Sequence, residues 1–181
     1  MRGKIAVISH GPSANSFEDD GSYLLKIGVN SIAERLLLNW WVFIDAPVFG
    51  KYSPLGDPEI FCCDSAILAP GLIDMRPHVF SGSPLLYDHL WMTGNYWSHK
   101  SGLAAIRLAA MLANAMLCRA GERCDVHLFG YDMTGSDDVN GGHTGTRSDA
   151  RWKMERKHFD NLTMESTRDS RGLIQFILET P

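Results

Sequence analysis

The chain has 181 residues, of which 45% are hydrophobic and 21% are charged. This length and balance are typical of one soluble globular domain and exclude a disordered or fibrous chain. The net charge of −4 provides no overall basic field of the kind that attracts nucleic acid or an anionic membrane. We therefore expect a single domain over residues 1–181.

The cysteines and the N-terminal residues favour a cytoplasmic protein. No C-x-x-C spacing is present, and adjacent cysteines rarely bond to each other, so reduced thiols are expected. The four thiols belong to Cys62, Cys63, Cys118 and Cys124. Residues 1–5 pass directly into a predicted strand, which leaves no room for a signal peptide. The one long apolar stretch, 101–118, holds Arg107 and Asn114 near its middle, so stable membrane insertion is not expected.

Apolar runs alternate with polar or glycine-bearing loops along the first third of the chain. The predicted strands are 4–9, 23–29 and 40–44, and a short helix is predicted over 32–38. Each strand ends in a polar turn, which is the rhythm of β-α-β units. Further on, 59–63 and 66–68 are predicted as short strands, and 51–58 and 70–84 as loops rich in glycine and proline.

A helix, a strand and an acid form the unit around which the second half is organised. The stretch 101–118 is rich in alanine and leucine, and this pattern suits a helix buried against a sheet. The predicted strand 126–129 ends at Gly130 and Asp132, as at the carboxyl end of a parallel sheet. An amphipathic helix over 147–162 and a strand over 172–178 follow. The predicted fold is α/β: a single Rossmann-like domain with a mostly parallel central sheet flanked by helices.

The loop after the first strand is a candidate anion site. It contains His10, Gly11, Pro12 and Ser13, and Pro12 suits an early position of a helix. Free backbone N–H groups at such a helix start would favour a phosphate. A plain strand–turn–helix corner is the alternative, because neither G-x-G-x-x-G nor a P-loop is present.

Four further residues or pairs follow predicted strands or open the long helix. The amide of Asn30 can hydrogen-bond a base, a sugar or a phosphate, or serve as a turn residue. Asp45 either binds a ribose hydroxyl or caps the next helix. Ser101 and Gly102 offer a second anion site or an ordinary N-cap. Asp132 could bind substrate, coordinate a metal, or only satisfy nearby backbone N–H groups.

His143 is the histidine with the strongest case for catalysis. Glycines at 141, 142 and 145 place it in a flexible loop beside the expected site. A histidine titrates near neutral pH and can take a proton from an acceptor hydroxyl. A solvated loop histidine is the alternative. The other six histidines show no metal-ligand spacing, so no metal or cofactor is expected.

The helix predicted over 147–162 is basic at its start, with Arg147 and Arg151. Acidic residues interleave with its basic ones, which is typical of a solvated charged face. If this face borders the site, it could contact a phosphorylated or nucleic acid acceptor.

Together these segments resemble the bacterial CMP-sialic-acid-dependent sialyltransferases of glycosyltransferase family 42, and related bacterial and phage proteins of that fold. Residues 10–13 look like the family's Gly-Asn-Gly-Pro-Ser loop, and 29–31 like its Cys-Asn-Gln segment. Residues 101–103 and 128–132 look like its Thr-Ser-Gly helix start and its Ser-Gly-Ile-Asp. Residues 142–144 are similar to its Gly-His-Ser. The matches run in order from residue 9 to about residue 162.

The resemblance implies transfer of a sugar from a CMP- or UDP-sugar to an acceptor hydroxyl, without a metal. His143 would be the general base. The donor would contact His10 to Ser13, Asn30, Ser101, Gly102 and Asp132. Two positions depart from the family: His10 replaces an asparagine, and Thr134 replaces a tyrosine that helps the phosphate leave. Thr134 is assigned to the donor and nucleotide side, and Arg147 and Arg151 to the acceptor or phosphate side.

Three other functions stay open at this level. One is a phage-type glycosyltransferase that acts on hydroxymethylated bases in DNA, which would require a basic surface near His143. The second is an ATP-dependent pyrophosphokinase, and the third is a non-catalytic nucleotide-binding module. The acceptor (a glycan or modified DNA), the donor sugar and the oligomeric state are left open by the sequence.

Overall fold

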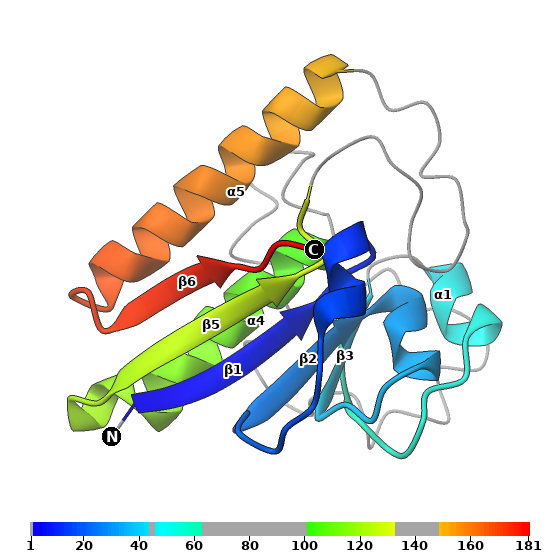
Figure 1. Ribbon diagram of the computed structural model, residues 1–181, viewed down its shortest axis with the longest axis horizontal. Coiled ribbons are helices and arrows are strands. Elements are labelled where there is room, and N and C mark those ends of the chain that lie inside the picture. The colour runs from blue at the N-terminus through cyan, green and yellow to red at the C-terminus, as the bar shows by residue number, and fades with distance from the viewer. Residues whose placement is uncertain (1, 44–45, 63–100, 133–148) are drawn as a thin grey trace.

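The computed structural model describes residues 2–43, 46–62, 101–132 and 149–181. Its centre is a six-stranded sheet in the order β4-β3-β2-β1-β5-β6, and every neighbouring pair is parallel (Figure 1). The predicted α/β class with a mostly parallel, Rossmann-like sheet is therefore confirmed.

The strands are β1 (Arg2–Ile8), β2 (Leu25–Val29), β3 (Trp40–Phe43), β4 (Glu59–Cys62), β5 (Arg123–Phe129) and β6 (Ile174–Leu178). The α-helices are α1 (Ala46–Lys51), α4 (Ser101–Met116) and α5 (Asp149–Asp169). Three short 3-10 turns complete the described elements: η1 (Pro12–Ser16), η2 (Asn30–Glu34) and η5 (Cys118–Ala120).

The helices differ from the sequence-based predictions more than the strands do. The helices expected after the first and second strands are single 3-10 turns of five residues each. Helix α5 continues seven residues past the predicted end at 162, because the prediction followed the apolar stripe, which stops at Leu162, and a largely exposed helix end needs no such stripe. The predicted strand at 66–68 lies outside the described residues.

Helix α4 covers one face of the sheet. Its alanines bring the helix close to the strands, and Ile106 and Leu108 are fully buried between them. The strands present every second residue to this helix, Ile5 and Val7 from β1 among them. Because both the helix and the facing strand residues are apolar, this layer is the principal hydrophobic core.

The opposite face of β1 and β5 is covered by turns rather than by an α-helix in the described part of the chain. An aromatic cluster packs there, with ring centroids 5.1 Å apart for Phe17 and Phe129 and 5.6 Å apart for Tyr23 and His127. His127 also pairs through Nδ1 with Glu179 Oε1 at 2.6 Å. The connection between β1 and β2 thus covers this face with aromatic side chains instead of an α-helix.

Shortening a buried α4 side chain tests whether this helix is the core. We expect Ile106→Ala to lower the free energy of unfolding by about 2–5 kcal/mol, because the substitution leaves a cavity. Urea denaturation measures the loss. Met116→Ala on the same helix is the control, since Met116 is 49% exposed, and it should change stability by less than about 0.5 kcal/mol. Equal losses in the two variants would contradict the assignment.

Candidate functional site

The order of the strands shows where the direction of the chain across the sheet reverses. The chain runs outward from β1 through β2 and β3 to β4, and then returns to the other side of β1 with β5 and β6. The switch therefore lies between β1 and β5, which pair along seven residues from Arg2 to Ile8. In open α/β sheets, ligands bind outside the carboxyl ends of the strands at such a switch point.

A carboxylate and a hydroxyl lock together the two loops at this switch point. Ser13 Oγ donates to Asp132 Oδ2 at 2.9 Å and accepts from the N–H of Gly130 at 2.8 Å. The N–H of Ser13 donates to the same carboxylate oxygen at 3.0 Å. Ser13 is fully buried, so the bond from Gly130 is buried and the two bonds to Asp132 are partly buried, and leaving a buried partner unsatisfied is costly. We call this arrangement the Ser13–Asp132 lock.

The lock requires glycine at two positions. Gly130 has φ +75°, and a Cβ there would lie 2.7 Å from the carbonyl carbon and oxygen of Ser9. A Cβ on Gly11 would collide with the Asp132 carboxylate and lie 2.7 Å from Gly130 O. The two backbones can approach this closely because neither residue has a side chain.

The prediction that the first loop has free backbone N–H groups at Gly11 and Ser13 is wrong. The N–H of Gly11 donates to Gly130 O at 3.0 Å, that of Ser13 donates to Asp132, and that of Ala14 donates to Gly11 O at 2.9 Å. Pro12 has no N–H, and η1 is too short to supply a helix dipole. The anion held by this turn is the protein's own Asp132, so the interpretation as a structural corner fits these bonds better.

Asn30 stands in a strained backbone at the carboxyl end of β2. Its φ is +48°, a region that residues other than glycine seldom occupy. The indole Nε1 of Trp41 donates to its carbonyl oxygen at 2.7 Å and holds this conformation. Its Oδ1 is buried and has no hydrogen-bond partner among the residues that the structure describes. Strain combined with an unsatisfied acceptor is typical of a position that meets a ligand.

A second bond ties the loop after β1 to the loop after β2. His10 Nε2 lies 3.0 Å from Ser31 Oγ, and Ser31 is buried at the start of η2. The imidazole is itself half-buried. It therefore lies at the same edge of the sheet as Asn30, in an orientation that the Ser31 hydroxyl fixes.

The first turn of α4 reaches the same edge from the face that α4 covers. Tyr131 donates its hydroxyl to Gly102 O at 2.8 Å. A Cβ on Gly102 would lie 3.3 Å from the Tyr131 ring and 3.7 Å from Ser9 Oγ. Complete burial raises the pKa of Tyr131 far above its ordinary value, so the phenol stays protonated and keeps donating. Ser101 is buried beside it.

The structure thus brings together the switch-point loop, Asn30, Asp132 and the start of α4. Arg151 lies in the first turn of α5, and only its backbone is described. Four expected candidates lie outside the described residues: Asp45, Thr134, His143 and Arg147.

Sequence reasoning missed Tyr131 and Trp41, which support the edge without facing a ligand. The sequence pattern places Trp41 in an apolar strand and Tyr131 in the turn between Gly130 and Asp132. Their polar atoms are the available signal, because a buried tyrosine or tryptophan needs a hydrogen-bond partner and often finds it in a nearby irregular backbone.

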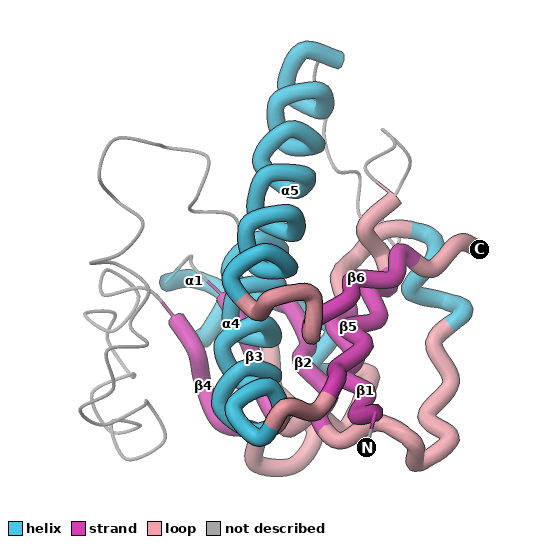
Figure 2. The backbone as a smooth tube through the Cα atoms, turned by 90° about the vertical axis from the view of Figure 1, so that its left-hand side faces the viewer, coloured by secondary structure: helices cyan, strands magenta, loops and turns pink. Residues whose placement is uncertain are grey.

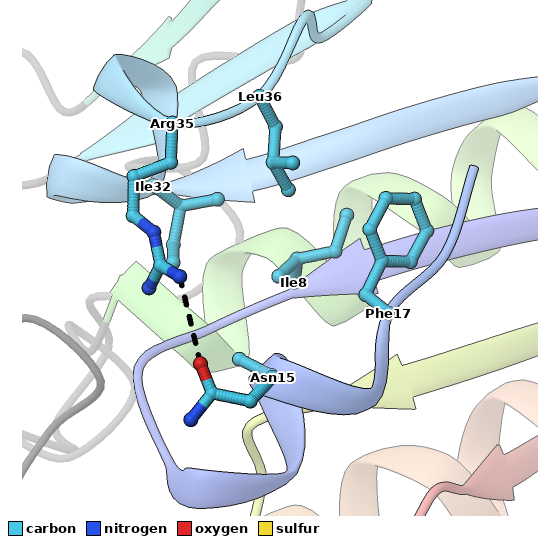
Figure 3. Close-up of a pocket in the computed structure, with 7 residues that line it drawn as sticks. Ile8, Asn15, Phe17, Ile32, Arg35 and Leu36 are labelled. Atoms are coloured by element: carbon cyan, nitrogen blue, oxygen red, sulfur yellow. Dashed lines mark hydrogen bonds between the residues drawn. The ribbon is translucent and has the colours of Figure 1, made fainter.

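A separate hollow of about 130 Å³ lies between η1 and η2, on the face away from α4 (Figure 3). Arg35 and Asn15 stand at its edge and make a long hydrogen bond of 3.5 Å. Its deepest side chains, Ile8 and Ile32, are fully buried. The hollow contains no acid or histidine among its lining residues, and we assign no ligand to it.

Comparisons with protein-family models, curated proteins and solved structures find no match to this chain. Among the described residues, no group of three or more histidine, cysteine or acidic side chains could hold a metal ion. In the same part of the chain, one helical stretch, Ser101–Ala120, is long and apolar enough to cross a membrane, and 56% of it is buried in the protein. That burial is consistent with the role of α4 as a core helix.

Removing the serine hydroxyl tests the lock. We expect Ser13→Ala to lower the free energy of unfolding by about 1–3 kcal/mol, because it leaves the Gly130 N–H and part of the Asp132 carboxylate without partners. Denaturant titration measures the change. Ser53→Ala makes the same substitution at an exposed position and should have little effect. An unchanged stability of Ser13→Ala would show that the three bonds are not structurally important.

Two glycines with the same backbone conformation provide a matched test of the close approach. Gly130 has φ +75° and Gly121 has φ +76°, but a Cβ on Gly121 would meet nothing within 4 Å. We expect Gly121→Ala to cost about 1–2 kcal/mol from the left-handed backbone alone. Gly130→Ala should cost clearly more, because its Cβ also collides with Ser9. Equal losses in thermal unfolding would argue against the collision.

Proposed function

We propose that this protein is a glycosyltransferase that binds a nucleotide-sugar donor along the carboxyl edge between β2, β1 and the start of α4. One observation carries the proposal: the buried, unsatisfied Oδ1 of Asn30 at a strained position beside the switch point. Such an oxygen accepts an O–H or N–H from a ligand, and ribose hydroxyls and base amino groups supply both.

The start of α4 is the better candidate for the donor phosphates. The helix has 16 residues, so its N-terminus carries a substantial partial positive charge. The first loop contributes shape and position, because the N–H groups of Gly11, Ser13 and Ala14 already bind oxygens of the protein. This division assigns the nucleoside to the β2 side of the edge and the phosphates to the α4 side.

The proposed reaction is a displacement at the anomeric carbon. The acceptor oxygen forms a bond to that carbon while the bond to the phosphate oxygen breaks, and the electron pair leaves with the nucleotide. His143 accepts the proton of the acceptor hydroxyl as general base. The resemblance to glycosyltransferase family 42 supports this role.

Ligand binding is tested with Asn30→Gly, which removes the amide and keeps the positive φ. A thermal-shift screen against CMP, UDP, GDP and ATP identifies the nucleotide, because a ligand that binds only the folded protein raises its melting temperature. We expect a cytidine or uridine nucleotide to stabilise the wild type and to bind Asn30→Gly roughly 2- to 10-fold more weakly, the value of one hydrogen bond.

Asn114→Ala, at an exposed position near the other end of α4, is the control and should bind as the wild type does. Stabilisation by ATP only with Mg²⁺ would instead support a pyrophosphokinase. Absence of stabilisation by every nucleotide would reject the proposal.

The catalytic role of His143 is tested by its removal. We expect His143→Ala to lower donor consumption by roughly 10²- to 10⁴-fold, the usual contribution of a positioned acid–base group, with nucleotide affinity unchanged. His158→Ala, on α5, is the control and should keep full turnover. Unchanged turnover in His143→Ala would remove this residue from the mechanism. Nucleotide binding by the wild type without any donor consumption would indicate a non-catalytic binding module.

A further inference from the structure

Helix α5 separates its charges along its length. Residues 150–158 hold four basic side chains and one acid, whereas residues 159–169 hold three acids and one basic side chain. The basic residues of the first part are Arg151, Lys153, Arg156 and Lys157, and the acids of the second part are Asp160, Glu165 and Asp169. In a chain with a net charge of −4, this basic segment is a local exception.

The basic part projects beyond the sheet at the edge of the candidate site. The ring centroids of Phe159 and Tyr131 lie 6.1 Å apart, so Phe159 is level with the loop after β5. Because α5 runs antiparallel to the strands, residues 149–158 lie past the carboxyl edge. Figures 1 and 2 show α5 extending well beyond the ends of β5 and β6. At 1.5 Å per residue the projection is about 15 Å long.

The exposed side of this projection is basic. Lys153 and Lys157 are both exposed and lie one turn apart on the same side of the helix. Arg156 directly precedes Lys157 in the sequence. The central carbon of its guanidinium lies 5.6 Å from the Phe159 ring centroid. Of the two acids in residues 149–158, Asp149 is the first residue of the helix and Glu155 is buried.

We propose that the basic projection, residues 149–158, binds the phosphate backbone of duplex DNA. The projection is a convex helix, which suits an extended polyanion, whereas sites for small molecules are concave. Peripheral binding to an anionic membrane requires an apolar helix face as well. Here Phe159 and Leu162, at the base of the projection, are buried in the protein, and its own apolar residues Trp152 and Met154 are partly buried. That this DNA is the acceptor of the sugar rests on the proposed glycosyltransferase activity. That the projection binds DNA does not depend on that activity.

The experiment measures fluorescence anisotropy of a labelled duplex DNA of mixed sequence, without any nucleotide sugar, across a series of salt concentrations. We expect the wild type to bind at low salt and to release the DNA as salt rises. Lys153→Gln with Lys157→Gln removes two phosphate contacts. This double variant should bind roughly 10- to 100-fold more weakly near 0.1 M salt, with the slope of log affinity against log salt reduced by about 2.

The control removes two positive charges from elsewhere: Arg119→Gln with Arg168→Gln, both at exposed positions. It should keep wild-type affinity if the projection binds the DNA. Glutamine has nearly the helix propensity of lysine, and circular dichroism checks that α5 is intact. No binding at low salt, or an equal loss in both double variants, would overturn the proposal. So would binding to phosphatidylserine vesicles with no binding to DNA. Absence of transferase activity would leave the binding result standing.

Discussion

The Ser13–Asp132 lock is the constraint on which the candidate site depends. It joins two loops that are separated by 119 positions in the chain and fixes them at the point where the strand order reverses. A buried serine hydroxyl that both donates to a carboxylate and accepts from a backbone amide leaves neither partner unsatisfied. Two glycines allow the backbones to approach closely enough for these bonds. The carboxyl edge is consequently rigid between β1 and β5.

The edge differs in character on the two sides of this lock. Toward β2, Asn30 keeps a strained backbone and an unsatisfied oxygen, held there by the Trp41 indole. Toward α4, a buried tyrosine fixes the first turn of the helix. The lock itself has no free amide to offer, because its anion is internal. A ligand bound at this edge therefore gains its polar contacts on either side of the switch point rather than at the glycine turn, where a phosphate site was expected.

The sheet was predictable from the sequence, and the reasons are local. Continuous runs of β-branched and apolar residues, such as those of β1 and β2, have little alternative when both faces are buried. The alanine-rich helix α4 was equally predictable from the sequence. The connections were not, because a five-residue 3-10 turn and a full helix begin with the same proline and serine signals. The end of α5 was placed too early, since its last two turns continue without an apolar stripe.

The site was predictable as a set of positions but not as a set of roles. Glycine and acid signals at strand ends placed Gly11, Asn30 and Asp132 at one edge, and the parallel sheet brings them there. No sequence pattern shows that the Asp132 carboxylate occupies the amides of the first loop, because that depends on a contact between distant segments. The strain at Asn30 arises in the same way, from a tryptophan on the neighbouring strand. Tertiary hydrogen bonds decide these roles.

Hydrogen exchange with and without the stabilising nucleotide tests the central claim most directly, because it locates bound ligand along the chain. The account predicts slower exchange in peptides that cover residues 28–34 and 101–106 at the carboxyl edge, with no change in peptides that cover η5 and the start of β6 at the opposite edge. Protection confined to the opposite edge, or to peptides that cover residues 14–17 and 35–36 at the hollow, would contradict it.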